Sequence, residues 1–563
     1  MTAPALLVAL PVIGPLLAAG GTLLLRRSLR AQRVLALGVV AAVAADAAVL
    51  LAAADAHGPA VAHLGGWPAP LGITLVADRL AALLLLTSAV VTLAVLGYAV
   101  GQGIVDDAPG TDGTSTSHPA TSHPDTSGAV TGNSGGPGAA SNRPAGGHSR
   151  HRDAGQSSIF NTCFLALVAG VALAYLTADL FNLFVAFEIM LSASYVLITL
   201  DTTASRIRAG MTYVIVSLTS SLLFITMLAL VYASTGTVTF AGLATAVPGL
   251  PGGLRAALSL LVLVVFGIKA AIVPLHFWLP DSYPTAPAPI TAVLAALLTK
   301  VAVYALVRTH TLVFPHSGTW PLLLSAAVAT LLVGALGALA QENLNRTLSF
   351  LLVSHIGFML FGLSLFTVIG LSGVILYMVH HIVVQATLFL GSGLITRYAG
   401  TSVPRRTGGL ASAVPLVAAL FAIPALSLSG VPLLSGFVAK LALLRAGARA
   451  AGPGGGADRT GVYVAVAAML VASLLTLLVM VRVWVYAFWR RPRPARPDPD
   501  PEDHLAVGTA TVSRAMTGAT AGLVAVGLAF PLAAGPLSGL TLRAAQDLLR
   551  PVAYEHAVTG AAR

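Results

Sequence analysis

The chain has 563 residues, of which 56% are hydrophobic and only 9% charged, and its net charge is +11. This composition lies outside the range of soluble globular domains, so the sequence predicts a multi-pass membrane protein in a lipid bilayer. The excess of arginine does not indicate a nucleic-acid partner, because the arginines cluster in short loops between apolar spans. A single cysteine, Cys163, excludes a disulfide framework. No haem, dinucleotide or zinc motif is present, so we expect no cofactor and no bound metal.

A spanning helix needs about 20 mostly apolar residues, and by this criterion the sequence predicts about 14 transmembrane helices. The predicted fold class is therefore an all-α polytopic membrane protein. Two spans, the seventh and the twelfth, contain interior prolines (Pro274 in the seventh, Pro424 and Pro432 in the twelfth) and are predicted to be broken. The approximate limits of the spans are 3–25, 33–54, 76–100, 159–178, 180–200, 210–233, 255–279, 288–308, 321–340, 347–366, 369–396, 411–450, 461–489 and 514–537.

The loops predict the orientation of the chain in the membrane. Arginines follow spans one, five, eleven and thirteen, whereas the loops after spans two, six and ten contain no lysine or arginine. The positive-inside rule then places the odd-numbered exits in the cytoplasm and both termini outside the plasma membrane. Arg445, Arg449 and Arg459, around the exit of span twelve, do not follow this pattern.

The two broken spans also predict an internal repeat. They lie five spans apart, and a repeat of an odd number of spans places its second copy upside down in the membrane. We therefore expect inverted five-helix repeats, with a polar route at each break. The predicted organisation is 1–100 for three N-terminal helices, 101–158 for a disordered cytoplasmic loop, 159–310 for the first repeat with helices 4–8, 321–489 for the second repeat with helices 9–13, and 490–563 for a cytoplasmic linker, helix 14 and a C-terminal tail.

Lysines are the most informative residues in the chain. There are only three, Lys269, Lys300 and Lys440, and all three lie in apolar segments, whereas every basic loop residue is an arginine. A buried ammonium gives up its proton readily and a guanidinium does not, so lysine at these positions suits proton transfer. Alternatively, a membrane lysine extends to the interface or joins two helices through a partner.

Other titratable residues occur at membrane depth. Glu188 is the only glutamate deep in a span, and we expect it to pair with Lys269, either as part of a proton relay or as a salt bridge that joins spans five and seven. His355 and His381 are candidate relay groups because histidine titrates near neutral pH, although each is also compatible with a structural core position. Gln385 lies one helical turn after His381 on the same face.

Four segments carry a resemblance to a known family: NLFVAFEIMLSASYVLI, FGIKAAIVPLHFWLPDSYPTAPAPITAVLAALLTKVAVYAL, SHIGFMLFG and LSLSGVPLLSGFVAK. They resemble the proton-conducting membrane subunits shared by respiratory complex I and the Mrp-type Na⁺/H⁺ antiporters, and the resemblance is greatest to the D subunits of the Mrp antiporters. The resemblance implies fourteen helices, inverted repeats with broken helices 7 and 12, and other membrane subunits as partners. It also implies a proton relay through Glu188, Lys269, Lys300, His381 and Lys440.

The function implied by this resemblance is proton translocation coupled to sodium efflux, by a transporter subunit and not by an enzyme. Gln385 stands where several relatives have lysine, so the link from Lys300 to Lys440 would need His381, His355 or water. One alternative is a membrane-arm subunit of an NADH–quinone oxidoreductase or a membrane-bound hydrogenase, with the redox chemistry on partner subunits. A second alternative is a structural membrane anchor.

Overall fold

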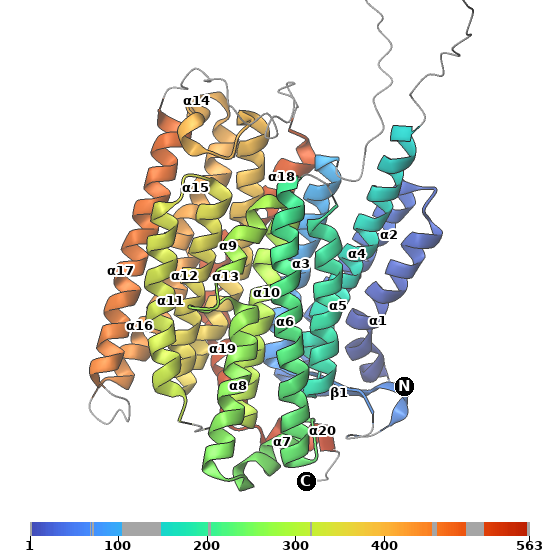
Figure 1. The fold of residues 1–563 in the computed structure, drawn as a ribbon, viewed down its shortest axis with the longest axis vertical. Helices are drawn as coiled ribbons and strands as arrows, with labels where there is room; N and C mark the ends of the chain where they lie inside the picture. Colours follow the sequence, from blue (N-terminus) through green and yellow to red (C-terminus); the bar gives the residue numbers. More distant parts are fainter. Residues whose placement is uncertain are drawn as a thin grey trace, which may run out of the picture.

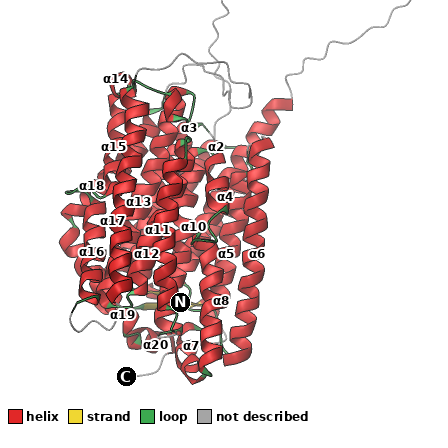
Figure 2. Ribbon diagram, turned by 60° about the vertical axis from the view of Figure 1, so that its left-hand side comes forward, coloured by secondary structure: helices red, strands yellow, loops and turns green. Residues whose placement is uncertain are grey.

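The chain forms a tall bundle of long helices that run along a common direction (Figures 1 and 2). The computed structural model describes residues 3–67, 69, 72–103, 148–200, 204–315, 318–452, 459–490 and 512–559. Both termini lie toward the lower end of the bundle in Figure 1. A short antiparallel hairpin of β1 (Ala60–His63) and β2 (Thr74–Ala77) lies at this end between the second and third helices.

Helices of the first part of the chain follow the predicted spans closely. Several begin at a side chain that caps the free backbone N–H groups of the first turn, for example Asp78 before α3 and Asp179 before α5. Their bounds are α1 (Ala3–Leu24), α2 (Leu29–His57), α3 (Arg79–Gln102), α4 (His148–Leu176), α5 (Leu180–Ile198), α6 (Ala204–Thr235), α7 (Phe240–Ala246), α8 (Gly252–Ala270), α9 (Trp278–Ser282) and α10 (Ala288–Arg308).

Helices of the second part are capped in the same way by Asn343 before α12 and Thr367 before α13. Their bounds are α11 (Trp320–Ala340), α12 (Leu344–Ser364), α13 (Val368–Ala399), α14 (Leu410–Ala413), α15 (Pro415–Ser429), α16 (Ser435–Ala450), α17 (Arg459–Trp484), α18 (Arg514–Leu532), α19 (Ala534–Leu549) and α20 (Val552–Thr559). Short π-helical turns extend α10 over Thr309–Val313 and α17 over Val485–Trp489.

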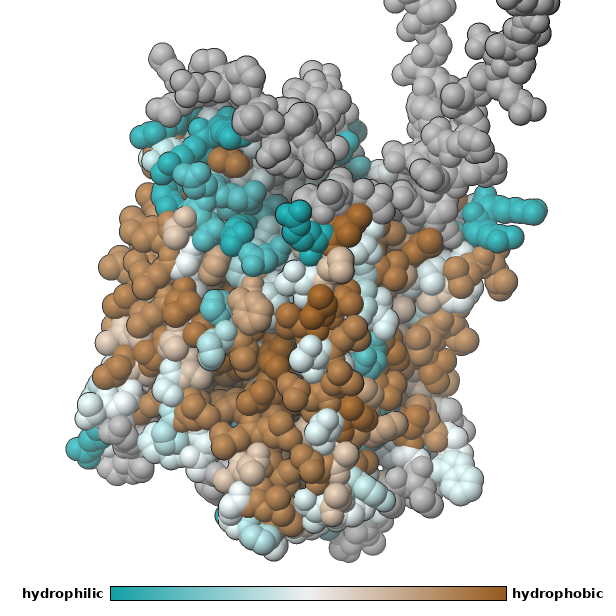
Figure 3. All heavy atoms as spheres, viewed as in Figure 1, coloured by the Kyte–Doolittle hydropathy of each residue, from teal (hydrophilic) through white to brown (hydrophobic). Residues whose placement is uncertain are grey.

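The prediction of about 14 spanning helices is confirmed. Thirteen helices in the described part of the chain are long and apolar enough to cross a membrane. The remaining predicted span, 411–450, is divided into α15 and α16, which are too short to cross singly. On the face shown in Figure 3, apolar side chains cover the middle of the bundle, and hydrophilic side chains gather toward its upper end.

Both predicted helix breaks are present. Helix α8 ends at Ala270, directly after Lys269, and Ala271 adopts the left-handed conformation with φ of 60°. The second break follows Ser429, where Gly430 has φ of 90° and Leu433 has φ of 71°. The prediction that Pro424 interrupts the helix is wrong, because α15 continues through it. The loss of one intrahelical hydrogen bond at Pro424 is tolerated inside a packed helix. Pro432, the other predicted interruption, does lie in the break between Ser429 and Ser435.

Some predicted boundaries also need correction. Helix α4 begins at His148, so the predicted loop of residues 101–158 does not extend to residue 158. Residues 104–147 of that loop lie outside the described residues, as do residues 491–511 of the predicted linker. The predicted C-terminal tail contains helices α19 and α20, because its apolar side chains pack on the bundle, as Leu548 and Tyr554 do.

The centre of the bundle consists of α10, α12 and α13. Every residue from Pro289 to Arg308 in α10 is buried, and the apolar windows of α12 and α13 are almost completely buried. By contrast, α6 and α17 leave much of their apolar surface uncovered within this chain. The helices that carry Lys300, His355 and His381 are therefore the ones most shielded from lipid.

Candidate functional site

Glu188 and Lys269 lie close together, but a serine stands between them. Ser221 of α6 donates a short hydrogen bond to a carboxylate oxygen of Glu188, and Lys269 Nζ lies 3.4 Å from the same hydroxyl. Glu188 is partly exposed within this chain, whereas Lys269 is 7% exposed. The predicted pair is therefore a three-residue bridge that joins α5, α6 and α8 (Glu188–Ser221–Lys269).

The end of α8 and two aromatic rings stabilise the Lys269 ammonium. Lys269 lies in the last turn of α8, where unpaired backbone carbonyls favour a positive charge. Its Nζ is 5.0 Å from the ring centroid of Phe187 and 6.0 Å from that of Phe224, which are cation–π distances. A cavity of about 20 Å³, lined by Lys269, Ser217 and Ser220 among others, lies beside it and has room for a water molecule.

The turn before α5 contains a further buried carboxyl group. Asp179 accepts a hydrogen bond of 2.5 Å from the backbone N–H of Asn182 and so fixes the start of the helix that carries Glu188. Burial raises the pKa of Asp179 to about 6. Asp179 is therefore a helix cap, and it lies about two and a half helical turns away from Glu188.

Lys300 occupies the middle of α10 with no exposed surface. Its Nζ donates a hydrogen bond of 2.7 Å to the carbonyl oxygen of Ala295. Within the described residues no carboxylate forms an ion pair with it. Lys300 interacts electrostatically with His381 on the neighbouring helix α13. The connecting role of Lys300 stays a prediction.

The histidines form one compact aromatic cluster on α12 and α13. The rings of His355 and His381 stack with centroids 5.2 Å apart, and His355 Nδ1 is 2.6 Å from the hydroxyl oxygen of Tyr377. Both ring nitrogens of His381 and Nε2 of His355 are buried, with no hydrogen-bond partner among the described residues. A water molecule at this cluster could therefore bond to these nitrogens and exchange protons with them.

Lys440 lies at the second helix break. Its Nζ donates hydrogen bonds of 3.0 Å to the carbonyl oxygens of Leu428 and Ser429, at the C-terminal end of α15. It also lies 5.0 Å from the ring centroid of Phe358. A Cβ atom at Gly430 would lie 2.9 Å from Lys440 Cδ, so the glycine makes room for the lysine as well as for the turn.

Several residues at the two breaks were not among the predicted site residues. They are Ser221, Tyr377, His380 and Ser435. His380 Nδ1 is 2.9 Å from the Ser435 hydroxyl, which is itself 2.8 Å from the hydroxyl of Ser427. The helical spacing of Tyr377 to His380 and His381 is a signal that could have identified the tyrosine. Nothing in the sequence distinguishes Ser221 from the other hydroxyl residues of α6.

Gln385 does not join the histidine cluster by a hydrogen bond. Its amide nitrogen donates to the carbonyl oxygen of Leu348 at 3.1 Å, and its amide oxygen is buried without a partner among the described residues. The six predicted site residues thus fall into two groups, one at each break, with Lys300 between them. Over the described part of the chain, the Lys300 ammonium bonds to a backbone carbonyl and to neither group, so water is needed to connect them.

Known proteins are similar to this chain in sequence. A family model described as "NADH:quinone oxidoreductase/Mrp antiporter, TM" matches residues 177–453. A protein from Alkalihalophilus pseudofirmus, named as the D subunit of a Na(+)/H(+) antiporter, is 36% identical over 443 residues, which cover 78% of this chain and 80% of that protein. The protein of the same name from Bacillus subtilis is 33% identical over 443 residues, with the same coverage of 78% and 80%.

Solved structures resemble the chain over its full length. A chain in the Mrp complex from Dietzia sp. DQ12-45-1b superimposes with a TM-score of 0.83 and 29% identity, covering 100% of both chains. A chain in a membrane-bound sulfane sulfur reductase, an archaeal respiratory membrane complex, superimposes with a TM-score of 0.77 and 23% identity, covering 99% of both chains. The second likeness concerns the fold alone.

Proposed function

Because the chain belongs to the NADH:quinone oxidoreductase/Mrp antiporter family, we propose that it is the proton-translocating subunit of a multisubunit Na⁺/H⁺ antiporter. Protons move through Glu188 and through buried lysine and histidine side chains while sodium leaves the cell. One observation carries the proposal: a buried lysine lies at each helix break, Lys269 at the first and Lys440 at the second, and a third lysine, Lys300, is buried in α10 beside the helices that carry His355 and His381.

At the first break, the protonation of Lys269 depends on the charge of Glu188. Ser221 contacts both Glu188 and Lys269, so a proton on Glu188 removes the negative charge that stabilises the Lys269 ammonium. Lys269 then releases its proton toward the interior more readily. The serine hydroxyl both accepts and donates, so it can pass a proton between the two groups.

The second break receives the proton. Lys300 on α10 lies beside α13, the helix that carries His381, so a change of charge at Lys300 changes the protonation of His381. His381 stacks on His355, and Lys440 interacts electrostatically with both histidines. Arrival of a proton at one group thus lowers the proton affinity of the next, which is the electrostatic form of coupling between sites.

The same proposal covers the surroundings of the chain. Its partners are other membrane subunits of a heteromeric complex, and its ions are protons and sodium. We infer that this transporter subunit has no enzymatic chemistry of its own, and we place it in the plasma membrane with both termini outside. The hydrophilic upper end of the bundle, opposite both termini, supports this orientation (Figures 1 and 3).

The test uses everted membrane vesicles that contain the complete complex. After a pH gradient has been formed, addition of sodium should collapse it with the natural chain. The same complex with Lys440→Arg should not respond, because a guanidinium keeps the charge but cannot release a proton. A matched control is Arg445→Lys, the reverse exchange at an exposed site on α16, which should behave like the natural chain.

Two outcomes would contradict the proposal. If sodium fails to collapse the gradient while the natural complex is fully assembled, the antiporter function is wrong, and a redox-linked or anchoring role becomes the better account. If the Lys440→Arg complex responds normally, protons do not leave through Lys440 and the second break is structural.

A further inference from the structure

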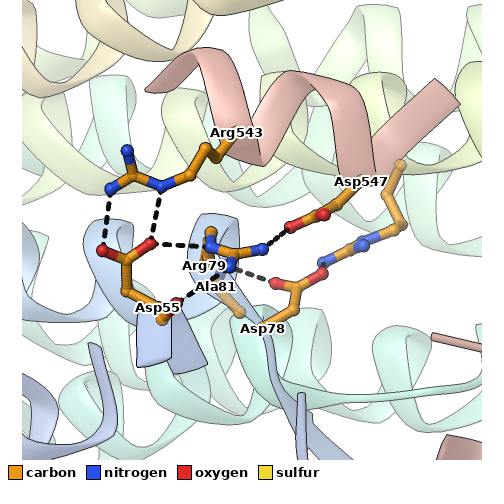
Figure 4. A network of polar contacts seen from close by, with 7 residues as sticks. Asp55, Asp78, Arg79, Ala81, Arg543 and Asp547 are labelled. Carbon is orange, nitrogen blue, oxygen red and sulfur yellow. Dashed lines mark hydrogen bonds and ion pairs between the residues drawn. The ribbon is translucent and has the colours of Figure 1, made fainter. Parts of the chain in front are cut away.

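An ion-pair network at the lower end of the bundle joins the two ends of the chain (Figure 4). Arg79 at the start of α3 contacts Asp55 of α2 at 2.8 Å and Asp547 of α19 at 2.7 Å. Arg543 of α19 contacts the same Asp55 at 2.7 Å. These pairs are partly exposed, and together they fasten the C-terminal helix α19 over the N-terminal helices.

One pair of this network differs from the others because it is almost fully buried. Arg308 Nη2 lies 2.7 Å from Asp78 Oδ2, and the two side chains are 4% and 7% exposed. Asp78 also accepts a hydrogen bond of 2.8 Å from the backbone N–H of Ala81, which caps α3. A buried ion pair contributes little to stability because of its desolvation cost, so its placement calls for another explanation.

Arg308, the last residue of α10, borders a cavity. The cavity has a volume of about 20 Å³ and is lined by Asp78, Arg308, Asp547 and Tyr554, among others. The Tyr554 hydroxyl is buried at its wall without a partner among the described residues, and the volume is sufficient for a water that would satisfy it. Water from the lower end of the bundle can therefore approach the guanidinium.

Arg308 lies about two helical turns after Lys300 on α10, with Tyr304 between them. Lys300, Tyr304 and Arg308 follow one another at intervals of four residues, so each lies near the next along one stripe of the helix surface. Arg308 is about 12 Å from Lys300 along the helix axis. Arg308 donates to the Tyr304 hydroxyl from Nε at 3.3 Å and from Nη2 at 3.2 Å. The Tyr304 hydroxyl in turn donates to the carbonyl oxygen of Tyr175 at 2.7 Å.

These hydrogen bonds block proton transfer along the stripe. The Tyr304 hydroxyl has one proton, and it points to a backbone carbonyl, which cannot pass it on. Among the described residues, the hydroxyl accepts hydrogen bonds only from the Arg308 guanidinium, which does not release protons. The Arg308 guanidinium lies against the Tyr304 ring and hydroxyl, so its positive charge repels a proton that enters along the stripe, as an arginine in a pore does.

We propose that Arg308, held by Asp78, is a proton seal: it closes the shortest route between Lys300 and the lower end of the bundle, so that protons must travel through the two helix breaks. Arg308 is thus a positioning and specificity residue that takes no part in the relay itself. The seal rests on the proposed function only in that Lys300 carries protons. Without the proton seal, protons would cross this chain and the pH gradient would collapse independently of sodium.

The test compares passive and sodium-induced collapse of a pH gradient in everted vesicles that carry the complete complex. The double variant Asp78→Asn/Arg308→Gln removes both charges while keeping the side chains polar, so it leaves no unpaired buried charge. We expect its gradient to decay severalfold faster than that of the natural complex in the absence of sodium. The matched control is Arg543→Gln, which removes a partly exposed arginine of the same network and leaves the Asp78–Arg308 pair intact, so its gradient should decay no faster than that of the natural complex.

The outcomes separate the seal from a purely structural role. If the assembled double variant keeps its pH gradient as long as the natural complex does without sodium, the proton seal is wrong, whatever the response to sodium. If the double variant is absent from the membrane, the single variant Arg308→Gln provides the same test, because it keeps Asp78 and the cap of α3. Its pH gradient should also decay faster than that of the natural complex in the absence of sodium. If the natural complex shows no sodium response but the charge-neutral variant leaks, the antiporter function fails and the seal stands.

Discussion

The two helix breaks stabilise a buried lysine in different ways. At the first break, Lys269 shares the Ser221 hydroxyl with a carboxylate, Glu188. At the second break, Lys440 is bound by two carbonyl oxygens at the end of α15 and by an aromatic ring. The sequence explains the contrast, because residues 344–450 contain no aspartate or glutamate at all.

This difference assigns different tasks to the two breaks. A carboxylate that can be protonated switches the charge balance of its lysine, so the first break can hold a proton and release it on a signal. Backbone carbonyls cannot change their charge, so the direct partners of Lys440 do not change when a proton moves. The protonation of Lys440 then depends on the charges of the neighbouring histidines and of Lys300. The first break therefore controls the transfer, and the second transmits it.

Among changes at Lys269, Glu188, His381 and Ser221, the largest effect is expected for Lys269→Arg, because arginine keeps the positive charge at the first break but cannot release a proton. Sodium-induced collapse of the pH gradient should fall by about 100-fold or more, as for loss of a proton-transfer group. The matched control is Arg255→Lys near the start of the same helix, which should retain full activity. Normal transport by the Lys269→Arg complex would mean that the first break does not carry protons.

Glu188→Gln tests whether the carboxylate is what distinguishes the two breaks. Glutamine keeps the length and a hydrogen bond to Ser221 but cannot become negatively charged. We expect transport to fall by about 5- to 150-fold, the range of typical coupling energies between sites. The pH profile of the remaining activity should lose its dependence on this carboxyl group. An unchanged rate and profile would show that Glu188 only joins α5 to α6.

His381→Phe tests the transmitting role of the second break. Phenylalanine keeps a flat ring to stack on His355 but has no nitrogen to hold a proton. Transport should fall by about tenfold, or roughly 1.4 kcal/mol in the barrier, because His355 and His380 remain close by. The corresponding exchange at His310, a buried histidine that is not part of the cluster, is the control. Equal losses at both positions would indicate a packing defect.

Much of this architecture could be predicted from the sequence, because membranes impose simple rules. About twenty apolar residues specify a span, and prolines inside a span predict a break, so the breaks near Lys269 and Lys440 were both predicted. The exact position of the second break was not, since Pro424 looks like an interruption in the sequence yet lies inside α15. Whether a proline ends a helix depends on the packing around it.

Some of the site residues could likewise be predicted from the sequence, and others could not. Charged and titratable residues at membrane depth are rare, so Glu188, Lys300 and His381 stand out in an apolar sequence. Serine is common in membrane helices and usually bonds to its own backbone, as Ser234 of α6 does. Only the packing of α5, α6 and α8 shows that Ser221 bonds to two charged groups instead.

The smallest expected effect is that of Ser221→Ala, and it addresses the element that only the structure identifies. If the hydroxyl carries the proton between Glu188 and Lys269, its removal costs one hydrogen bond of about 0.5–1.5 kcal/mol and slows transport roughly two- to tenfold. Water from the adjacent cavity can replace the hydroxyl in part, so transport should not be abolished. Ser234→Ala on the same helix should have no effect on sodium-induced collapse of the gradient. A rate for Ser221→Ala equal to that of the natural chain would mean that Glu188 and Lys269 communicate through charge alone.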